Sequence, residues 1–246
     1  MLKLIFTFFS LCIFFFGFSQ RTPAKTREMD GVKPIALTSS TFQNLGGSTL
    51  EGQVFYVKAS NDVEGSPLLF DDWKSGEVTL ANSEKYAVDK LNMDASSDKF
   101  IYLKNDTMYE IFNEVKEIKI NIENTEDESH KYMLFKEGIN PDNGNFVQVL
   151  ASGKITIFQE YDKKPEGENY SNGIVEHTRK YVLHSSKSAL VGKKVIPIKN
   201  YSASALEGLT SDKKIEVAAY VKQNNLKLKK ESDFLKAIDY YNSIAP

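Results

Sequence analysis

Cysteine is almost absent from this sequence. The 246 residues contain one, Cys12, inside an apolar run near the N-terminus. A lipoprotein would need this residue to become the new N-terminus, but apolar residues continue after it to Phe16, and Leu11 stands where a small residue is required. We therefore expect no lipid attachment and, once the N-terminal run is removed, no disulfide and no thiolate metal site.

Histidine is also scarce, with three residues at His130, His177 and His184. Metal or acid–base chemistry needs at least two such side chains aimed at one point. His177 and His184 fall on one predicted strand at an odd separation, which sends them to opposite faces. The sequence also lacks a Gly-x-Ser-x-Gly elbow, a phosphate-binding glycine loop and a dinucleotide fingerprint. We expect no metal site, no cofactor and no catalytic residue that can be named.

An excess of positive charge is missing as well. The 31 basic and 33 acidic residues are interspersed and give a net charge of −2. A nucleic-acid partner would usually leave a strongly basic footprint, and attraction to a membrane surface would need a polybasic segment. We therefore predict no nucleic-acid partner. The sequence leaves the oligomeric state open.

Long apolar runs are confined to the N-terminus. Lys3 precedes an apolar stretch that reaches Phe18, and a small-x-small site, residues 17–19, comes directly before Gln20. This pattern predicts a signal peptide, residues 1–19, cleaved after Ser19. The stretch is short for an uncleaved anchor, which needs about 20 apolar residues. We expect an exported protein in the periplasm, at the outer membrane or outside the cell, with no transmembrane segment in the mature chain.

Residues 20–48 are polar and predict a linker or a loosely packed arm. Between residues 49 and 200, short runs rich in Val, Ile, Tyr and Phe are separated by turn residues, which predicts an antiparallel β-domain. Residues 115–122 alternate most clearly between apolar and polar side chains. Further strands are predicted at residues 77–80, 85–93, 99–104, 107–112, 131–136, 145–151, 154–161, 174–184 and 194–199. With no helix between them, the fold class is mainly β, a meander forming a sandwich or a soluble barrel-like domain.

Residues 201–246 differ in pattern and predict a helical tail. Helices are expected at residues 202–207, 212–223 and 232–244. In the last of these, Phe234, Ala237, Ile238 and Tyr241 share one apolar stripe. Such a stripe has to be covered, so we expect the tail to pack on the β-domain.

The most conspicuous local motif places two carboxylates, Asp71 and Asp72, beside the only tryptophan, Trp73. A glycosidase uses two carboxylates about 5 to 10 Å apart, often with an aromatic sugar platform. Neighbours on a strand point to opposite faces, and in a turn one Asp would cap the backbone. The structural interpretation is favoured, and the three residues remain candidates for ligand binding.

Two stretches resemble a family of exported Bacteroidota proteins with no known activity. The first is Gly-Ser-Pro-Leu-Leu-Phe-Asp-Asp-Trp at residues 65–73, with Gly-Glu-Val-Thr-Leu at 76–80. The second is the tail, from Asp-Lys-Lys at 212–214 through Tyr-Val-Lys at 220–222 to Tyr-Tyr-Asn-Ser at 240–243. The resemblance rests on packing and turn residues. It implies an exported β-rich protein with a helical C-terminal tail and assigns no site residue.

The favoured function is a non-enzymatic exported envelope protein that binds a partner protein or an envelope component. The alternative is a hydrolase acting on glycans with the carboxylates near Trp73. A deep cleft with converging carboxylates would favour the hydrolase, and a filled core there would favour the binding module.

The signal peptide can be tested directly. We expect protein purified from the cell envelope to begin at Gln20 and to have the mass of unlipidated residues 20–246. N-terminal sequencing and intact mass measure this. A mass that includes residues 1–19, or an acylated Cys12, would contradict the prediction.

Overall fold

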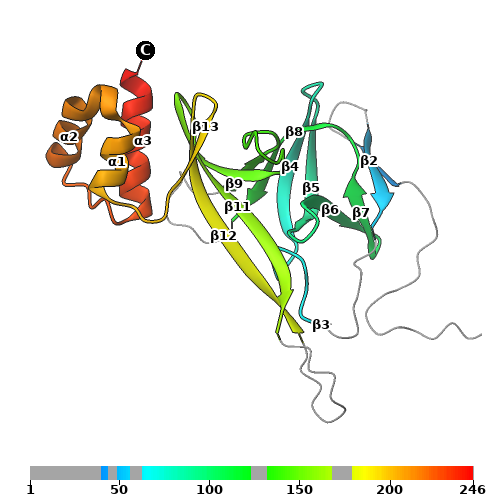
Figure 1. Cartoon of the computed structure of the whole chain (residues 1–246). Helices are drawn as coiled ribbons and strands as arrows, with labels where there is room; N and C mark the ends of the chain where they lie inside the picture. Colours follow the sequence, from blue (N-terminus) through cyan, green and yellow to red (C-terminus); the bar gives the residue numbers. More distant parts are fainter. Residues whose placement is uncertain (1–39, 44–48, 56–62, 123–131, 168–178, 246) are drawn as a thin grey trace, which may run out of the picture. The chain divides into compact units, whose positions relative to one another are not determined.

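The sheet accounts for about half of the residues that the structure, a computed structural model, describes: 40–43, 49–55, 63–122, 132–167 and 179–245 (Figure 1). All of them belong to one compact unit. The strands are β1 (Ser40–Gln43), β2 (Thr49–Val54), β3 (Val63–Glu64), β4 (Lys74–Leu80), β5 (Lys85–Asp94), β6 (Lys99–Lys104), β7 (Thr107–Ile111), β8 (Val115–Asn121), β9 (Tyr132–Lys136), β10 (Val147–Ala151), β11 (Ile155–Glu166), β12 (Arg179–Val191) and β13 (Lys194–Pro197). The helices are α1 (Ala203–Leu209), the 3-10 helix η2 (Ser211–Lys213), α2 (Lys214–Gln223) and α3 (Glu231–Ile244).

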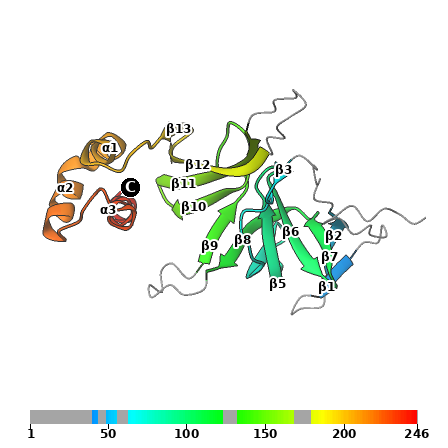
Figure 2. The same cartoon turned by 90° about the horizontal axis from the view of Figure 1, so that it is seen from below.

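The strands form one open sheet in the order β1-β2-β7-β6-β5-β4-β8-β9-β10-β11-β12-β13. Every pairing along this path is antiparallel, and β3 alone pairs in parallel, with β12. Figure 2 shows the succession from β8 to β12 and the three helices after β13. The mainly β, antiparallel fold class with C-terminal helices is therefore confirmed. The sequence did not decide between a sandwich and a barrel-like arrangement, and the hydrogen-bonded order is that of an open sheet.

Tight hairpins follow from the turn residues. Asn105 and Asp106 join β6 to β7 and both have positive φ, 49° and 58°. Two successive residues in this left-handed region make the type of two-residue turn whose twist matches that of the flanking strands. Asn and Asp tolerate the conformation because their short polar side chains bond locally to the backbone.

One apolar core lies against strands β2 and β4 to β9. Its fully buried members include Tyr86, Leu91, Tyr102, Ile118 and Phe135. In β8 the alternation seen in the sequence becomes one buried and one wetter face. This half of the sheet therefore holds together by burial of its own side chains, with no helix needed to cover it.

A second core joins the helices to β10, β11 and β12. Its strand members are Ala151, Ile155, Ile157 and Ala189. Its helical members are Leu206, Leu209, Val217, Phe234, Leu235, Ala237, Ile238 and Tyr241. The apolar stripe of α3 is thus buried in a cluster shared with the sheet, as the pattern of the tail requires.

Some element bounds differ from the sequence-based prediction. The sheet already includes residues 40–43, within the segment 20–48 expected to be a linker, and the remainder of that segment lies outside the described residues. Strands β11 and β12 run on past residues 161 and 184, to Glu166 and Val191. Residues 162–166 are mostly polar and so give no apolar pattern. The added part of β12, residues 185–191, begins with the polar run Ser-Ser-Lys-Ser.

Burial in the second core predicts a contrast between two substitutions in the tail. Phe234→Ala removes a fully buried ring and should lower the free energy of unfolding by about 3 to 5 kcal/mol. Ile215→Ala changes a side chain of α2 that is 83 % exposed and should shift stability by less than about 0.5 kcal/mol. Urea melts of both variants beside the parent protein measure this. Equal effects of the two substitutions would show that the tail does not pack as described.

Candidate functional site

The Asp71–Asp72–Trp73 motif lies in a bend before β4. Both carboxylates are exposed and Trp73 is half-buried. The bend is held by Asn92, a fully buried residue of β5. The Asn92 side-chain NH₂ donates to the Phe70 carbonyl at 2.8 Å, and the Phe70 backbone N–H donates to the Asn92 amide oxygen at 3.2 Å. A buried amide thus satisfies the backbone of the bend, as a buried polar group must.

Further bonds fix the same bend from the end of β5 and from one other strand, β11. The Leu69 N–H donates to the carbonyl of Met93 at 2.7 Å, and the Ala95 N–H donates to the carbonyl of Pro67 at 3.0 Å. The ammonium of Lys163, in β11, donates to the Leu68 carbonyl at 2.6 Å. These contacts give the segment before Trp73 a structural role. A ligand-binding role for Asp71, Asp72 and Trp73 stays a prediction.

Of the three histidines, His184 alone lies among the described residues. Its Nε2 is 2.6 Å from the Glu166 carboxylate, and both side chains are about half-exposed on the β11–β12 ribbon. Within the described part of the chain, no group of three or more His, Cys, Asp or Glu could hold a metal ion. His177, which is predicted to point away from His184, lies outside the described residues.

Three acidic residues, Asp98, Glu137 and Glu160, lie near the turn between β5 and β6. Asp98 has a positive φ of 57° and accepts a hydrogen bond from the Phe146 N–H at 2.9 Å. The pKa of Asp98 is raised to about 6: burial is the largest cause, the bond from the Phe146 N–H lowers it, and the nearby charges of Glu137 and Glu160 raise it. Glu160 accepts bonds from the side chains of Asn140 and Asn143 at 2.9 and 2.8 Å. These hydrogen bonds connect the β5–β6 turn and β11 to the loop between β9 and β10, so the acidic residues have a structural role.

The helical tail contains an apolar groove of about 500 Å³ between α1, α2 and the loop that follows α2. Leu206 and Val217 are buried on its floor, and Val221, Leu226 and Leu228 line it as half-buried side chains. The exposed Ala203 and Ala218 also line it. Small side chains on α1 and α2 therefore leave room that the larger ones do not fill.

Charged residues border the groove with a positive excess. Its lining contains Glu207, Lys214, Lys222 and Lys227, together with the polar Thr210 and Asn225. The Lys214 ammonium is 2.7 Å from the Glu207 carboxylate. Lys222 and Lys227 form no ion pair with any described residue. Asp233 accepts the Lys227 backbone N–H at 2.8 Å. The groove thus combines an apolar wall with two ammonium groups that form no ion pair among the described residues.

A second cavity, of about 570 Å³, shares the loop after α2 with the groove. Lys187, Lys199 and Lys229 line it, with Ile198, Asn200, Tyr201 and Ser202, and no acidic residue is among them. Glu231 forms an ion pair with Lys187 and accepts the Tyr201 hydroxyl at 2.8 Å. Burial first, and then this carboxylate, raises the pKa of Tyr201. Because Lys187 is paired, the positive charge in this cavity comes from Lys199 and Lys229.

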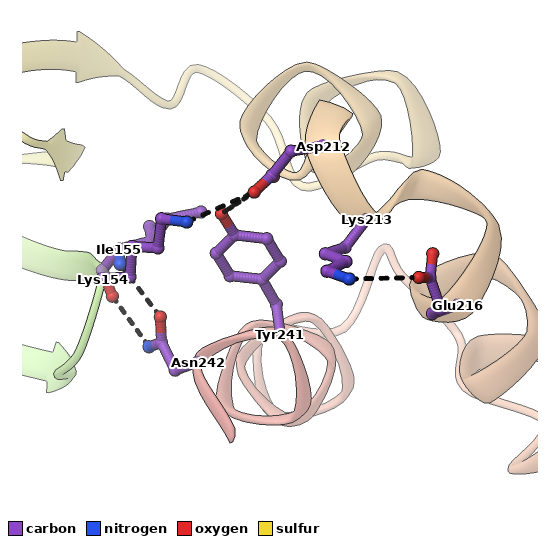
Figure 3. A network of polar contacts seen from close by, with 7 residues as sticks. All are labelled: Lys154, Ile155, Asp212, Lys213, Glu216, Tyr241 and Asn242. Carbon is purple, nitrogen blue, oxygen red and sulfur yellow. Dashed lines mark hydrogen bonds and ion pairs between the residues drawn. The ribbon is translucent and has the colours of Figure 1, made fainter. Parts of the chain in front are cut away.

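Polar contacts between the tail and the β10–β11 turn hold the helices that form the groove (Figure 3). The Asn242 side chain accepts the Ile155 N–H at 2.9 Å and donates to the Ile155 carbonyl at 2.8 Å. The Tyr241 hydroxyl donates to Asp212 at 2.9 Å, and Lys154 lies 3.3 Å from the same carboxylate. One turn of the sheet is thus tied to α3 and to η2, the residues directly before α2.

The groove was not anticipated from the sequence. Its only local signal is the Leu-Lys-Leu-Lys-Lys run at residues 226–230, which lies between two predicted helices. The walls come from three separate elements, so no single stretch displays them. No helix among the described residues is long and apolar enough to cross a membrane.

No family model, no curated protein and no solved structure matches this chain. The resemblance to exported Bacteroidota proteins therefore remains a prediction. The functional argument has to rest on the geometry of the chain itself.

The raised pKa of Asp98 predicts that Asp98→Asn increases the free energy of unfolding in a pH-dependent way. The folded-state pKa of Asp98 lies above the ordinary 3.8. Ionisation of Asp98 therefore leaves the free energy of unfolding unchanged below pH 3.8, lowers it increasingly up to about pH 6, and has its full destabilising effect above that pH. Asn still accepts the Phe146 N–H and carries no charge. Because the site is partly solvated, the gain above pH 6 should be about 1 kcal/mol and should vanish below pH 3.8.

The control for this experiment is Asp106→Asn, which changes the same residue type at another left-handed position, φ 58°, in an exposed turn. It reports the preference of Asn for this backbone conformation, an effect with no pH dependence. Denaturant melts across the pH range compare the two variants. A gain for Asp98→Asn that is the same at every pH would contradict the assignment.

Proposed function

We propose that this protein is a non-enzymatic, exported binding module of the cell envelope, and that the groove on its helical tail is the ligand site. The observation that carries the proposal is the groove itself. Its volume of about 500 Å³ and its largely apolar lining match the usual character of small-ligand sites, which are clefts of roughly 300 to 1,000 Å³ with a few charged or polar groups.

The charged lining favours binding over catalysis. General acid–base chemistry needs a titratable group directed at a reacting atom, commonly held there by a second group. The one carboxylate of the lining, Glu207, is in an ion pair with Lys214. The remaining charges, Lys222 and Lys227, form no ion pair with a described residue, although Asp233 accepts the Lys227 backbone N–H at 2.8 Å, and their ammonium groups suit the recognition of an anion.

The β-domain would then serve as a rigid support. The second core and the Asn242 contacts to Ile155 join the tail to β10, β11 and β12. A site built on packed elements holds its geometry better than one on a free loop. Export, the other part of the proposal, rests on the signal-peptide pattern of residues 1–19.

The proposal predicts crosslinking from the groove in the native envelope. A photoreactive phenylalanine analogue at Ala203, an exposed residue that lines the groove, should give a discrete adduct with a protein or an envelope molecule. Ala218→Trp should abolish that adduct, because the indole fills the groove from α2. Gels and mass spectrometry of the adduct measure the result.

The matched control is Ala219→Trp, since Ala219 is equally exposed on α2 but does not line the groove. The adduct should persist in this variant. If Ala203 gives no discrete adduct, or if the two Trp variants behave alike, the groove is not the ligand site.

A further inference from the structure

We infer that the groove binds an anionic single-chain amphiphile, with its acyl chain on the apolar wall and its acid group beside Lys222 and Lys227. This inference rests on the proposed function and adds the chemical class of the ligand. The groove and the two lysines carry it together, because neither an apolar wall nor a pair of surface lysines would specify an amphiphile alone.

The apolar wall suits a linear hydrocarbon. Leu206 and Val217 form a floor that is closed to solvent, and Val221, Leu226 and Leu228 form sides that are still partly exposed. Every methylene that leaves water for such a surface adds to the affinity. The half-buried side chains would lose their remaining contact with water when a chain lies on them.

The charges select the head group. The groove lining has three lysines and one glutamate, and the Lys214–Glu207 pair cancels one charge of each sign. Lys222 and Lys227 remain, on exposed stems, so their ammonium groups can meet a carboxylate or phosphate at the mouth while their methylenes extend the wall. A cationic head group would be repelled from the same position.

The surrounding loop strengthens this electrostatic preference. Residues 221–230 contain four lysines and no acidic residue. Lys229 lines the second cavity with Lys199, so positive charge continues past the groove, and the Asp233 carboxylate on the Lys227 backbone offsets part of it. An anion approaching this part of the tail meets an attractive field from both sides of the loop.

A single small molecule fits better than a protein partner or a bilayer. A stable protein interface covers about 800 Å² on each partner, far more than one groove between short helices offers. Bilayer binding uses apolar side chains that project outward from a surface. Leu226 and Leu228 instead line a concavity, and the floor residues Leu206 and Val217 are buried.

The test is calorimetric titration of the mature protein with dodecanoate below its micelle concentration. Dodecyl maltoside and dodecyltrimethylammonium serve as probes with the same chain and a neutral or cationic head. We expect saturable binding of dodecanoate, at least tenfold weaker binding of the neutral probe and none of the cationic one. Ala218→Trp should abolish dodecanoate binding, and Ala219→Trp should leave it within about twofold.

Charge variants test the head-group contact separately. Replacing both Lys222 and Lys227 by Gln should weaken dodecanoate binding roughly tenfold, as expected for two partly exposed ion pairs. Lys236→Gln makes the same change on an exposed position of α3 that lines neither cavity and should have no effect. Circular dichroism and urea midpoints confirm that each variant is folded.

Equal binding of the three probes, or charge variants that bind like the parent, would overturn the inference while leaving the groove a ligand site. Tight binding to anionic vesicles that is unchanged in the Ala218→Trp variant would also overturn the inference. If dodecanoate fails to bind but a protein adduct forms from Ala203 and is lost in Ala218→Trp, the proposed function stands and only the ligand class is wrong. If dodecanoate does not bind and no adduct forms from Ala203, both the proposed function and the inferred ligand class are wrong.

Discussion

Burial of the apolar face of α3 is the constraint on which the helical half of the molecule depends. A helix of 14 residues has little stability alone, and its order comes from packing. Phe234, Ala237 and Ile238 are fully buried in the core shared with β10 to β12. Apolar burial has no direction of its own, so it would tolerate several positions of the helix. The two hydrogen bonds between Asn242 and Ile155 select one of them, because both backbone groups of one residue are met by one amide.

The groove follows from how the remaining helices join that core. Leu206 of α1 and Val217 of α2 are buried in the second core, so the inward face of each short helix already packs there. The small residues Ala203 of α1 and Ala218 of α2 also line the space and leave it open. Ala218 thus shapes the site by its small size, whereas the exposed Ile215, on the same helix, contributes nothing to the groove.

Much of the fold could be predicted, because the patterns report burial. The alternation in residues 115–122 and the stripe through Phe234 both correspond to faces that are buried. The end of β11, residues 162–166, was missed because a ladder of backbone hydrogen bonds needs no apolar side chains, and these residues have few. The end of β12, residues 185–191, was missed because it begins with the polar run Ser-Ser-Lys-Ser. The groove was missed for a different reason. Its walls come from α1, α2 and a loop, and only their packing brings Leu206, Val217 and Leu228 together.

The contrast between the motif at Asp71 and the lysines of the tail shows where composition misleads. Asp71–Asp72–Trp73 is conspicuous because two adjacent carboxylates stand beside the only tryptophan, yet the buried Asn92 accounts for the bend that contains it. The tail lysines are inconspicuous because the whole chain has a net charge of −2. A net charge excludes partners that need an extended basic footprint, such as nucleic acids. It says nothing about one acid group, which needs only two ammonium groups that are not held in ion pairs, and Lys222 and Lys227 supply them next to an apolar wall.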